Sequence, residues 1–400
     1  MPPRPRVALL IETSQIYGRE LCEGVASYVE THTSWSIYLD QRELGASPPM
    51  WFQRQNWEGV ITRVMSSQLA RSFRSCRIPV VDLTDRGSNY GFPRICSDDS
   101  AIGRAVAEKL AERGFRNFAF CGYTSEAWSE SRCKGFQKRI AESGNHCSVF
   151  LSAWVGPNSL PWDQEIESIC RWLRDLELPV GVMACNDQRG QQVLESCRRL
   201  GLDVPRDVAV IGVDNDQLLC RLSDPPLSSV VPDARGIGYE AAKILDLWMQ
   251  VGNSVAVNHL LPPLRINERS SSDTYATADQ ELTTALRFIQ KHACEGINVN
   301  DVLRCVSVSR SQLEREFREI VGRSPHAQIR KMQLDNAARL LLETDLPLRS
   351  VAAQSGFSGV EYFCSVFKKT FGRTAREFQS IQSQHRAKII SPDQLPLRHN

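Results

Sequence analysis

The chain of 400 residues is 42% hydrophobic and 24% charged, and its formal net charge is +2. This length exceeds a single compact core and predicts roughly two to four domains. The composition is that of a globular protein, and no apolar run approaches the ~18 residues of a membrane-spanning helix. The 13 scattered cysteines show no zinc-site spacing, so we expect reduced thiols in a cytoplasmic protein with no metal ion or other cofactor.

The distribution of charge is more informative than its sum. From Thr277 onward the chain has 18 Lys and Arg against 13 Asp and Glu, whereas the preceding part has 30 against 33. A basic C-terminal part beside a slightly acidic body is compatible with nucleic-acid binding through that part. Many solvated helical domains are equally basic, so the asymmetry does not establish DNA binding by itself.

The first 265 or so residues alternate strand-like and helix-like patterns. Residues 7–11 are too short for the core of a signal peptide and fit a buried first strand. Helices are predicted where apolar residues repeat at helical spacing, and a glycine follows most of them. In chain order we expect a strand at 6–11, a helix at 18–30, strands at 59–61 and 79–83, a helix at 99–113, a strand at 117–121, a helix at 130–143, a strand at 180–184, a helix at 188–200, a strand at 207–213 and a helix at 235–251.

This alternation predicts an α/β fold with parallel sheets and helices on both faces of each sheet. The length is about twice that of one such unit, which predicts two lobes with a cleft between them. After Pro262 and Pro263 a polar, Ser/Thr-rich stretch without periodicity indicates a linker. We therefore assign residues 1–266 to a two-lobed domain, 267–278 to the linker, 279–382 to an all-helical domain and 383–400 to a flexible tail.

The helical part contains two patterns of short helix, turn and second helix. In the first pattern, residues 299–305 precede a helix at 310–321, with Ser309 at its N-cap and Gln312 three residues later, as in a capping box. Its buried stripe is formed by Leu313, Phe317 and Ile320. The side chains left outward are those of Arg310, Ser311, Glu314, Arg315 and Arg318.

The second pattern follows a long helix predicted at 325–343. A short helix at 347–354 and a turn at 355–358 precede a helix at 359–371, which buries Phe363, Val366 and Phe367. The side chains left accessible are those of Glu361, Tyr362, Ser365, Lys368 and Lys369.

Short helix, tight turn and second helix form the helix-turn-helix layout, whose second helix enters a DNA major groove. One long helix between two such units places the two reading helices roughly one DNA turn apart. Arg315 is the candidate for a bidentate contact to guanine, whereas Lys368, Lys369 and Arg373 are candidates for phosphate contacts. The alternative is a helical protein-interaction domain with solvated basic residues, and the repetition of the unit favours DNA binding over it.

The segment from about 280 to 382 resembles the DNA-binding domain of the AraC/XylS family. It departs from the family at Ala375 and Gln379, where members mostly have proline and arginine, and both positions touch the closing helix. The resemblance implies base-facing roles for Ser311, Arg315, Glu361, Tyr362 and Ser365. It is carried by Gly356-Phe357, Phe363, Phe367-Lys368-Lys369, Phe371-Gly372 and Phe378.

The preceding part resembles LacI-type regulators and periplasmic sugar-binding proteins over nearly all of residues 6–265. This resemblance implies a two-lobed, periplasmic-binding-protein-like sensor of type I. An AraC-type domain after such a sensor reverses the usual order, in which the DNA-binding unit comes first. The motifs that carry it are Ile95 to Gly103, Phe118 to Gly122, Lys134-Gly135-Phe136, Ala184 to Asp187, Val210 to Asn215 and Pro226 to Val230.

Sugar hydroxyls both donate and accept hydrogen bonds, so a sugar site needs buried carboxylates, amides or arginines, and aromatic rings for the apolar sugar face. Asp187 could instead be a helix N-cap, Asp214 could stabilise a turn, and Trp128 could serve packing. Asp187 and Asp214 follow the carboxyl ends of strands, where ligands bind in open α/β sheets. The effector-site candidates are Gln15 and Tyr17 in the loop after the first strand, Asp187, Asp214, Asp233 at a return crossover, Trp128 as a stacking ring and, by the resemblance, Arg132.

The two resemblances together imply a sugar-responsive, DNA-binding transcription regulator. We expect a homodimer that activates a carbohydrate-utilisation operon through RNA polymerase in response to a pentose such as xylose. The loop at 12–19 departs from the pattern of enteric relatives, so another monosaccharide is an alternative. A second alternative is a sensor that serves dimerisation or binds a non-sugar effector. An enzyme is disfavoured because the chain lacks GxxxxGK[ST], GxSxG and HExxH.

Overall fold

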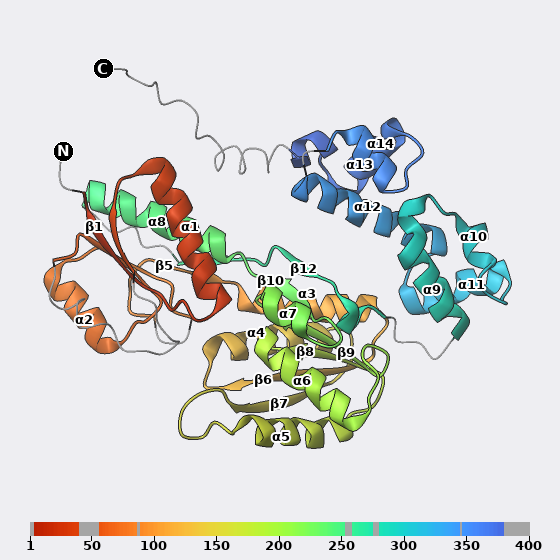
Figure 1. Cartoon of the computed structure of the whole chain (residues 1–400), viewed down its shortest axis with the longest axis horizontal. Coiled ribbons are helices and arrows are strands. Elements are labelled where there is room, and N and C mark those ends of the chain that lie inside the picture. Colours follow the sequence, from red (N-terminus) through yellow and green to blue (C-terminus); the bar gives the residue numbers. More distant parts are fainter. Residues whose placement is uncertain are drawn as a thin grey trace. The chain divides into compact units, whose positions relative to one another are not determined.

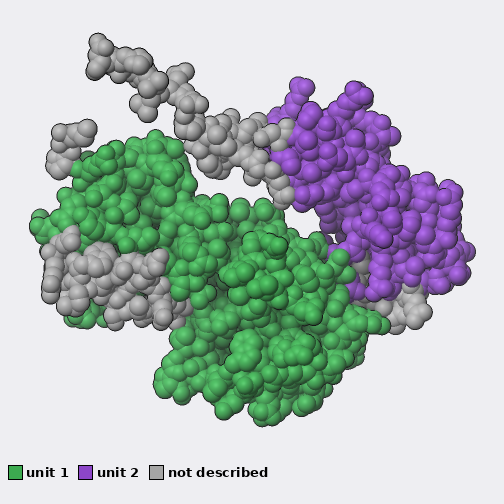
Figure 2. Space-filling view, in the orientation of Figure 1, with its two compact units in different colours: residues 1–111, 115–273 green, residues 112–114, 274–400 purple. Residues whose placement is uncertain are grey.

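The computed structural model describes residues 4–39, 56–85, 89–252, 258–274, 280–344 and 346–379. Two compact units make up the chain, residues 1–111 with 115–273 and residues 112–114 with 274–400 (Figure 2). In the described ranges, no helix combines the length and apolar character that a membrane span requires. The tail predicted at 383–400 lies outside the described residues.

The first unit contains two six-stranded sheets, each the centre of one lobe (Figure 1). The strand order of the first sheet is β11-β5-β4-β3-β1-β2, and every pairing in it is parallel. Its helices are α1 (Ile16–His32) and α8 (Ala234–Val251) on one face and α2 (Ser67–Cys76) on the other. Its strands are β1 (Arg6–Leu10), β2 (Ser36–Leu39), β3 (Gly59–Thr62), β4 (Val80–Asp82), β5 (Arg94–Ser97) and β11 (Asn258–Leu261).

The second sheet has the order β12-β10-β9-β8-β6-β7 and is parallel except for the edge strand β12, which runs antiparallel to β10. Its helices are α3 (Asp99–Glu112), α4 (Ala127–Ala141), α5 (Trp162–Arg174), α6 (Asp187–Leu200) and α7 (Gln217–Leu222). Its strands are β6 (Asn117–Thr124), β7 (Cys147–Ala153), β8 (Val180–Ala184), β9 (Val208–Val213), β10 (Ser228–Val231) and β12 (Arg265–Asn267).

The predicted α/β class and the two lobes are therefore confirmed. The chain passes between the lobes three times, after β5, after β10 and after β11, because α8 and β11 return to the first lobe. Gly201 (φ 69°) and Gly252 (φ 76°) end α6 and α8 with left-handed backbone, as predicted, whereas α4 ends at Ala141, before Gly144.

The linker predicted at 267–278 is folded in its first part. Ser270–Ser272 form a short 3₁₀ helix, and the side chains of Ser271 and Ser272 are buried. The Ser271 hydroxyl donates to the Val210 carbonyl (2.7 Å) and accepts from the Ser228 amide (2.8 Å). The polarity of these serines suggested a solvated linker. Instead, the Ser271 hydroxyl forms hydrogen bonds with backbone groups of the second sheet. Residues 275–279 lie outside the described part.

The second unit is helical and has two separate cores. The first core includes Leu313 and Phe317, and the second includes Phe363 and Phe367. Its α-helices are α9 (Gln280–His292), α10 (Val299–Leu303), α11 (Arg310–Glu316), α12 (Pro325–Glu343), α13 (Leu348–Gln354) and α14 (Val360–Phe371).

The long helix α12 connects the two cores. It contributes Ile329 to the first and Leu334 to the second. Between these positions, the buried side-chain amide of Gln333 donates to the Ala293 carbonyl (2.8 Å) and to the Gly356 carbonyl (3.2 Å). Gly356 has φ 77°, and a Cβ there would lie 2.8 Å from the Ala293 oxygen, so this turn requires glycine.

The helix predicted at 310–321 changes its winding. It is α-helical through Glu316 and then π-helical over Phe317–Val321. Ser309 caps it by accepting from the Gln312 amide (3.2 Å), as predicted. The predicted capping box is only half formed, because the Gln312 side-chain amide donates to Glu316 (2.9 Å).

Helices α1 and α8 touch through their backbones. A Cβ on Gly238 would lie 2.0 Å from the Leu21 carbonyl oxygen, and one on Gly24 would lie 2.0 Å from the Arg235 carbonyl oxygen. A side chain at either position would force the two helices apart, so we predict that Gly238→Ala lowers the free energy of unfolding by about 1–3 kcal/mol. Denaturant unfolding followed by circular dichroism measures the change.

The control is Lys243→Ala, which alters an exposed position on the same helix. Its expected effect stays within about 0.5 kcal/mol. Equal stability of the Gly238→Ala variant and the wild type would contradict the packing role of this contact.

Candidate functional site

A cavity in the first unit lies where strands of both sheets end. The empty space in this cavity, including the part that is open to solvent, is about 380 Å³. Most of its lining residues follow within five positions of the carboxyl end of a strand, whereas Tyr17 in α1 and Arg132 in α4 lie farther along the chain. The lining residues are Gln15, Tyr17, Arg63, Asp85, Trp128, Arg132, Trp154, Asn186 and Asp214.

The wall from the first lobe is centred on Arg63. Its guanidinium donates to Glu12 and, at 2.7 Å, to Asp85, and it lies 4.5 Å from the centre of the Tyr17 ring. The Tyr17 hydroxyl is 2.9 Å from the Ser97 hydroxyl. One buried oxygen of Glu12 and one of Asp85 have no hydrogen-bond partner among the described residues. Such buried acceptors are costly unless a ligand donates to them.

The wall from the second lobe is centred on Arg132, which is 4% exposed. Its Nε donates to Asp99 (2.8 Å), its Nη1 donates to the Cys185 carbonyl (2.6 Å), and its Nη2 lies 3.7 Å from Asp214. Burial raises the pKa of Asp99 to about 6, although the charge of Arg132 opposes this shift.

Two indole rings form an aromatic corner of the cavity. Trp128 and Trp154 meet nearly edge to face, with ring centres 5.4 Å apart and planes at 79°. Trp128 Nε1 donates to Glu126 (3.0 Å), and the Arg132 guanidinium lies 4.9 Å from its ring. Trp154 is stacked on Tyr123, with ring centres 5.1 Å apart. Trp128 therefore packs in the lobe and lines the cavity at once.

The stack rests on a fully buried arginine. Arg189 lies 4.1 Å from the centre of the Tyr123 ring and donates to Glu165 (2.5 Å) and Ser152 (2.6 Å). Because these partners fix the guanidinium, the orientation of Tyr123, and with it that of Trp154, is also restricted.

Asp214 lies in a turn of unusual backbone geometry directly after β9. Asp214 has φ 100° and Asn215 has φ 50°, both in the left-handed region that only Asn, Asp and Gly adopt readily. Burial raises the pKa of Asp214, and Arg132 and Arg63 oppose this shift. The turn aims the carboxylate at the cavity.

Two predicted effector residues do not line the cavity. Asp187 is buried in the first turn of α6 and accepts from the Ser229 hydroxyl (2.5 Å) and the Asp216 amide (2.7 Å). The N-cap of α6 is Asn186, so the alternative N-cap role of Asp187 is wrong. Asp233 caps α8 by accepting from the Gly236 amide (2.9 Å).

Sequence reasoning missed Arg63, Asp85, Trp154 and Asn186. Arg63 and Asp85 follow strands that the pattern did predict. Their positions directly after strand ends could therefore have marked them as candidates for the site. Trp154 follows β7, a half-buried strand that the pattern did not reveal. The part of the chain that the structure describes contains no cluster of three or more ligating side chains that could hold a metal ion.

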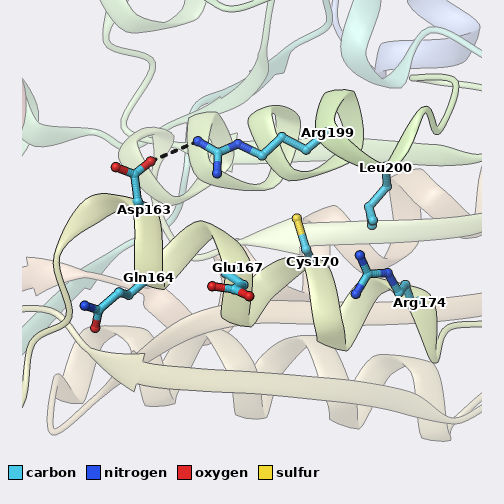
Figure 3. A pocket seen from close by; sticks show the side chains of 7 residues that line it. All are labelled: Asp163, Gln164, Glu167, Cys170, Arg174, Arg199 and Leu200. Atoms are coloured by element: carbon cyan, nitrogen blue, oxygen red, sulfur yellow. Dashed lines mark hydrogen bonds and ion pairs between the residues drawn. The ribbon is translucent and has the colours of Figure 1, made fainter.

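A second hollow lies on the surface of the second lobe between α5 and α6 (Figure 3). Arg199 and Asp163 form an ion pair across it (3.0 Å), and both side chains are at least 40% exposed. Its other lining residues, Gln164, Glu167, Cys170, Arg174 and Leu200, give it no buried polar group that lacks a partner. The cavity at the strand ends is therefore the better candidate site.

The reading helices present the predicted outward side chains. On α14, Tyr362 is 50% exposed, and its hydroxyl accepts from Arg330 of α12 (3.2 Å). On α11, Arg315 is exposed and makes no hydrogen bond or ion pair with another described residue, whereas Arg310 pairs with Glu314 (3.3 Å). The remaining exposed candidates are Ser311, Glu361, Ser365, Lys368 and Lys369.

The two departures at the closing helix are accommodated locally. Ala375 is 1% exposed and packs in the second core. The side-chain amide of Gln379 donates to the Leu346 carbonyl (3.1 Å), which ties the closing segment to the entrance of α13. Neither residue lies on α14, so the reading surface is unaffected.

Family models match three successive parts of the chain. A XylR N-terminal domain matches residues 6–94, a periplasmic binding protein-like domain matches residues 107–272, and a helix-turn-helix domain matches residues 302–381. Their order is that of the two lobes and the helical unit.

Full-length relatives show the same organisation. The xylose operon regulatory protein of Escherichia coli K12 is 31% identical over 95% of this chain and 98% of its own length. Its counterpart from Haemophilus influenzae is 29% identical over 94% and 98%. The solved structure of the xylose-binding transcription activator XylR covers 95% of this chain and 99% of its own, at 30% identity and a TM-score of 0.61.

The sequence identity to these xylose regulators extends over both units of the chain, so the similarity is more than a likeness of fold. A ribose-bound LacI-family regulator from Enterococcus faecium, at 17% identity and a TM-score of 0.56 over 67% of this chain, shares only the fold of the sensor. The chain belongs to the family of xylose operon regulatory proteins, and it is a sugar-responsive, DNA-binding transcription regulator and not an enzyme.

Proposed function

We propose that the cavity binds a monosaccharide, a pentose such as D-xylose, and that this sugar controls DNA binding by the helical unit. The observation that carries the proposal is the pairing of arginine with aspartate on both walls, Arg63 with Asp85 and Arg132 with Asp214. Such pairs bind neighbouring hydroxyls through donors and acceptors together. The names of the full-length relatives support xylose as the first sugar to test.

The proposed roles follow from the contacts. Asp214 and Asp85 accept from sugar hydroxyls, while Arg132 and Arg63 hold these carboxylates in place and donate to ring or hydroxyl oxygens. Gln15, Tyr17 and Asn186 supply further polar groups on the same walls. The indole corner covers an apolar sugar face. Asp187 and Asp233 act one step removed, through the turn at 214–216 and the start of α8.

Because the walls come from different lobes, sugar binding favours the arrangement in which the lobes are close. A ligand shifts such an equilibrium only by its differential affinity for the two states. We propose that the closed sensor, as a homodimer, places the helical units on adjacent DNA sites and activates transcription with RNA polymerase. A protein with this role works at the chromosome, in the cytoplasm.

In the helical unit, we propose that Arg315 reads a guanine and that Ser311, Glu361, Tyr362 and Ser365 contact base edges. Arg310, Lys368 and Lys369 then contact phosphates. These side chains are exposed on α11 and α14, the second helices of the two helix-turn-helix patterns, which supports this assignment.

A panel of monosaccharides tests the effector. D-xylose at ~100 times its Kd is expected to stabilise the protein by roughly 2.7 kcal/mol, which a thermal-shift assay and isothermal titration both detect. D-ribose, L-arabinose and D-glucose are the comparison sugars. A flat response to every sugar would instead favour a sensor that serves dimerisation or binds a non-sugar effector.

Asp214→Asn tests the cavity. Asparagine tolerates the positive φ of this turn but lacks the charge, so sugar affinity is expected to fall about 10-fold or more. The melting temperature of the unliganded variant measures separately what the loss of this partner of Arg132 costs in stability. Asp187→Asn is the comparison, because its amide nitrogen would face a donor at a position where the Asp187 carboxylate now accepts from the Ser229 hydroxyl, the Asp216 amide and the Cys220 thiol. It is expected to cost about 1–3 kcal/mol of stability and to lower sugar affinity less than Asp214→Asn does, because Asp187 acts on the cavity only through the turn at 214–216. The opposite ranking in calorimetric titrations would refute the assignment.

Two substitutions separate base reading from phosphate contact. Arg315→Ala is expected to cost about 1–3 kcal/mol on the preferred duplex and to relax the preference at one base pair. Lys368→Ala is expected to weaken binding to all duplexes alike and to lower the slope of log K against log salt by about one. Fluorescence anisotropy with a set of single-base variants measures both, with Lys243→Ala as the control. An unchanged base preference in Arg315→Ala would exclude its reading role.

A further inference from the structure

The exit segment, residues 265–273, leads from the sensor toward the helical unit. It is bound to the turn that carries Asp214. Arg269, in this segment, donates from Nη2 to the Asn215 side-chain oxygen (2.8 Å) and from Nη1 to the Leu227 carbonyl (2.8 Å). Asn215 is the direct neighbour of the cavity residue Asp214. One guanidinium therefore connects the cavity turn to the path by which the chain continues to the DNA-binding unit.

The backbone of the exit segment is fixed at the same place. The Arg269 amide donates to the Ser228 hydroxyl (2.7 Å), and that hydroxyl donates to the Arg269 carbonyl (2.9 Å). Ser271 binds the Ser228 amide and the Val210 carbonyl. The segment is thus clamped onto β9 and β10, the two strands that hold the turn.

The turn itself is held in a conformation that needs its partners. Asp214 and Asn215 are two successive non-glycine residues with positive φ, and such a backbone conformation persists only where surrounding contacts support it. Support comes from the Ser229 hydroxyl, which accepts from the Asn215 amide (2.9 Å) and donates to Asp187 (2.5 Å), and from Arg269. Asp214, which faces the cavity, and Asn215, which binds Arg269, therefore belong to one turn with shared supports.

We propose that Arg269 is a positioning residue that couples the effector cavity to the exit segment through Asn215. The sugar-bound turn holds Arg269, and with it residues 265–273, in one arrangement, and the unliganded turn releases it. The inference rests on the proposed sugar site and names the contact through which that site acts on the DNA-binding unit.

Four variants of the full chain test this proposal. Arg269→Ala removes the guanidinium. Asn215→Gly removes only the acceptor on the cavity turn, leaves the Leu227 carbonyl and the Gln217 side chain as acceptors of Arg269, and places a residue there that adopts positive φ without strain. Asn215→Asp keeps both the acceptor and the tolerance of left-handed backbone. Arg265→Ala is the matched control, because this exposed arginine of the same segment bonds only to its neighbour Asn267 among the described residues.

The readout is a ratio of DNA affinities with and without sugar. The duplex is selected from a random-sequence pool by the wild type in the presence of D-xylose, or of the panel sugar that stabilises the wild type most. Coupling between sites in regulators typically amounts to about 5- to 150-fold. We expect Arg269→Ala and Asn215→Gly to bring the ratio close to one while both still bind DNA, and Asn215→Asp and Arg265→Ala to keep the wild-type ratio.

The outcomes separate this proposal from the proposed function. If Arg269→Ala and Asn215→Gly keep the wild-type ratio within about twofold, the contact is a passive anchor and the proposal is wrong. A wild type that binds sugar but has a ratio of one also overturns the coupling and leaves the cavity assignment intact. A wild type that binds no sugar overturns both. Should Arg269→Ala fail to fold, as its melting curve would reveal, the comparison of Asn215→Gly with Asn215→Asp decides.

Discussion

The burial of the Arg132 guanidinium is the constraint on which the sensor depends. A charge removed from water costs several kcal/mol unless partners surround it, and here they come from different elements, Asp99 of α3, the Cys185 carbonyl after β8 and Asp214 after β9. Helices α3 and α4 must approach closely for Asp99 to reach Arg132, and Gly103 permits this, since a Cβ there would lie 2.1 Å from the Arg132 carbonyl oxygen. The ion pair between Arg132 and Asp99 and the close packing of α3 against α4 therefore depend on each other.

Much of the fold follows from local patterns. The helices and strands that were predicted for the sensor match the structure to within a few residues, because burial on one face imposes a repeat that the sequence must carry. The pattern missed the short buried strands β5 and β10 and the helices α2 and α5. It also failed where burial is partial or where side chains satisfy the backbone. Strand β7 is mostly half-buried and carries no clear alternation. Within the exit segment, the polar sequence of residues 268–273 suggests a solvated linker. Ser271 and Ser272 are nevertheless buried, and their hydroxyls form hydrogen bonds with the backbone and with Ser228.

The site was predictable where a residue follows a recognised strand and less so elsewhere. Gln15, Tyr17 and Asp214 line the cavity as their places after strands suggested. Asp187 occupies an equivalent place, yet its carboxylate is drawn away by Ser229 and the Asp216 amide. Which way a side chain turns after a strand end depends on donors that come from distant positions, and a single sequence does not reveal them.

The helix α12 has a consequence for the DNA and not only for the protein. Since it belongs to both cores, and Gln333 bonds to carbonyls on either side of it, the distance and angle between α11 and α14 are set by one continuous helix. A helical unit built in this way does not adjust the separation of α11 and α14 to a DNA site. If α11 and α14 both read one duplex, as proposed, the duplex has to bend or twist to present both segments, and the stiffness of the base pairs between them is then expected to be part of the sequence preference.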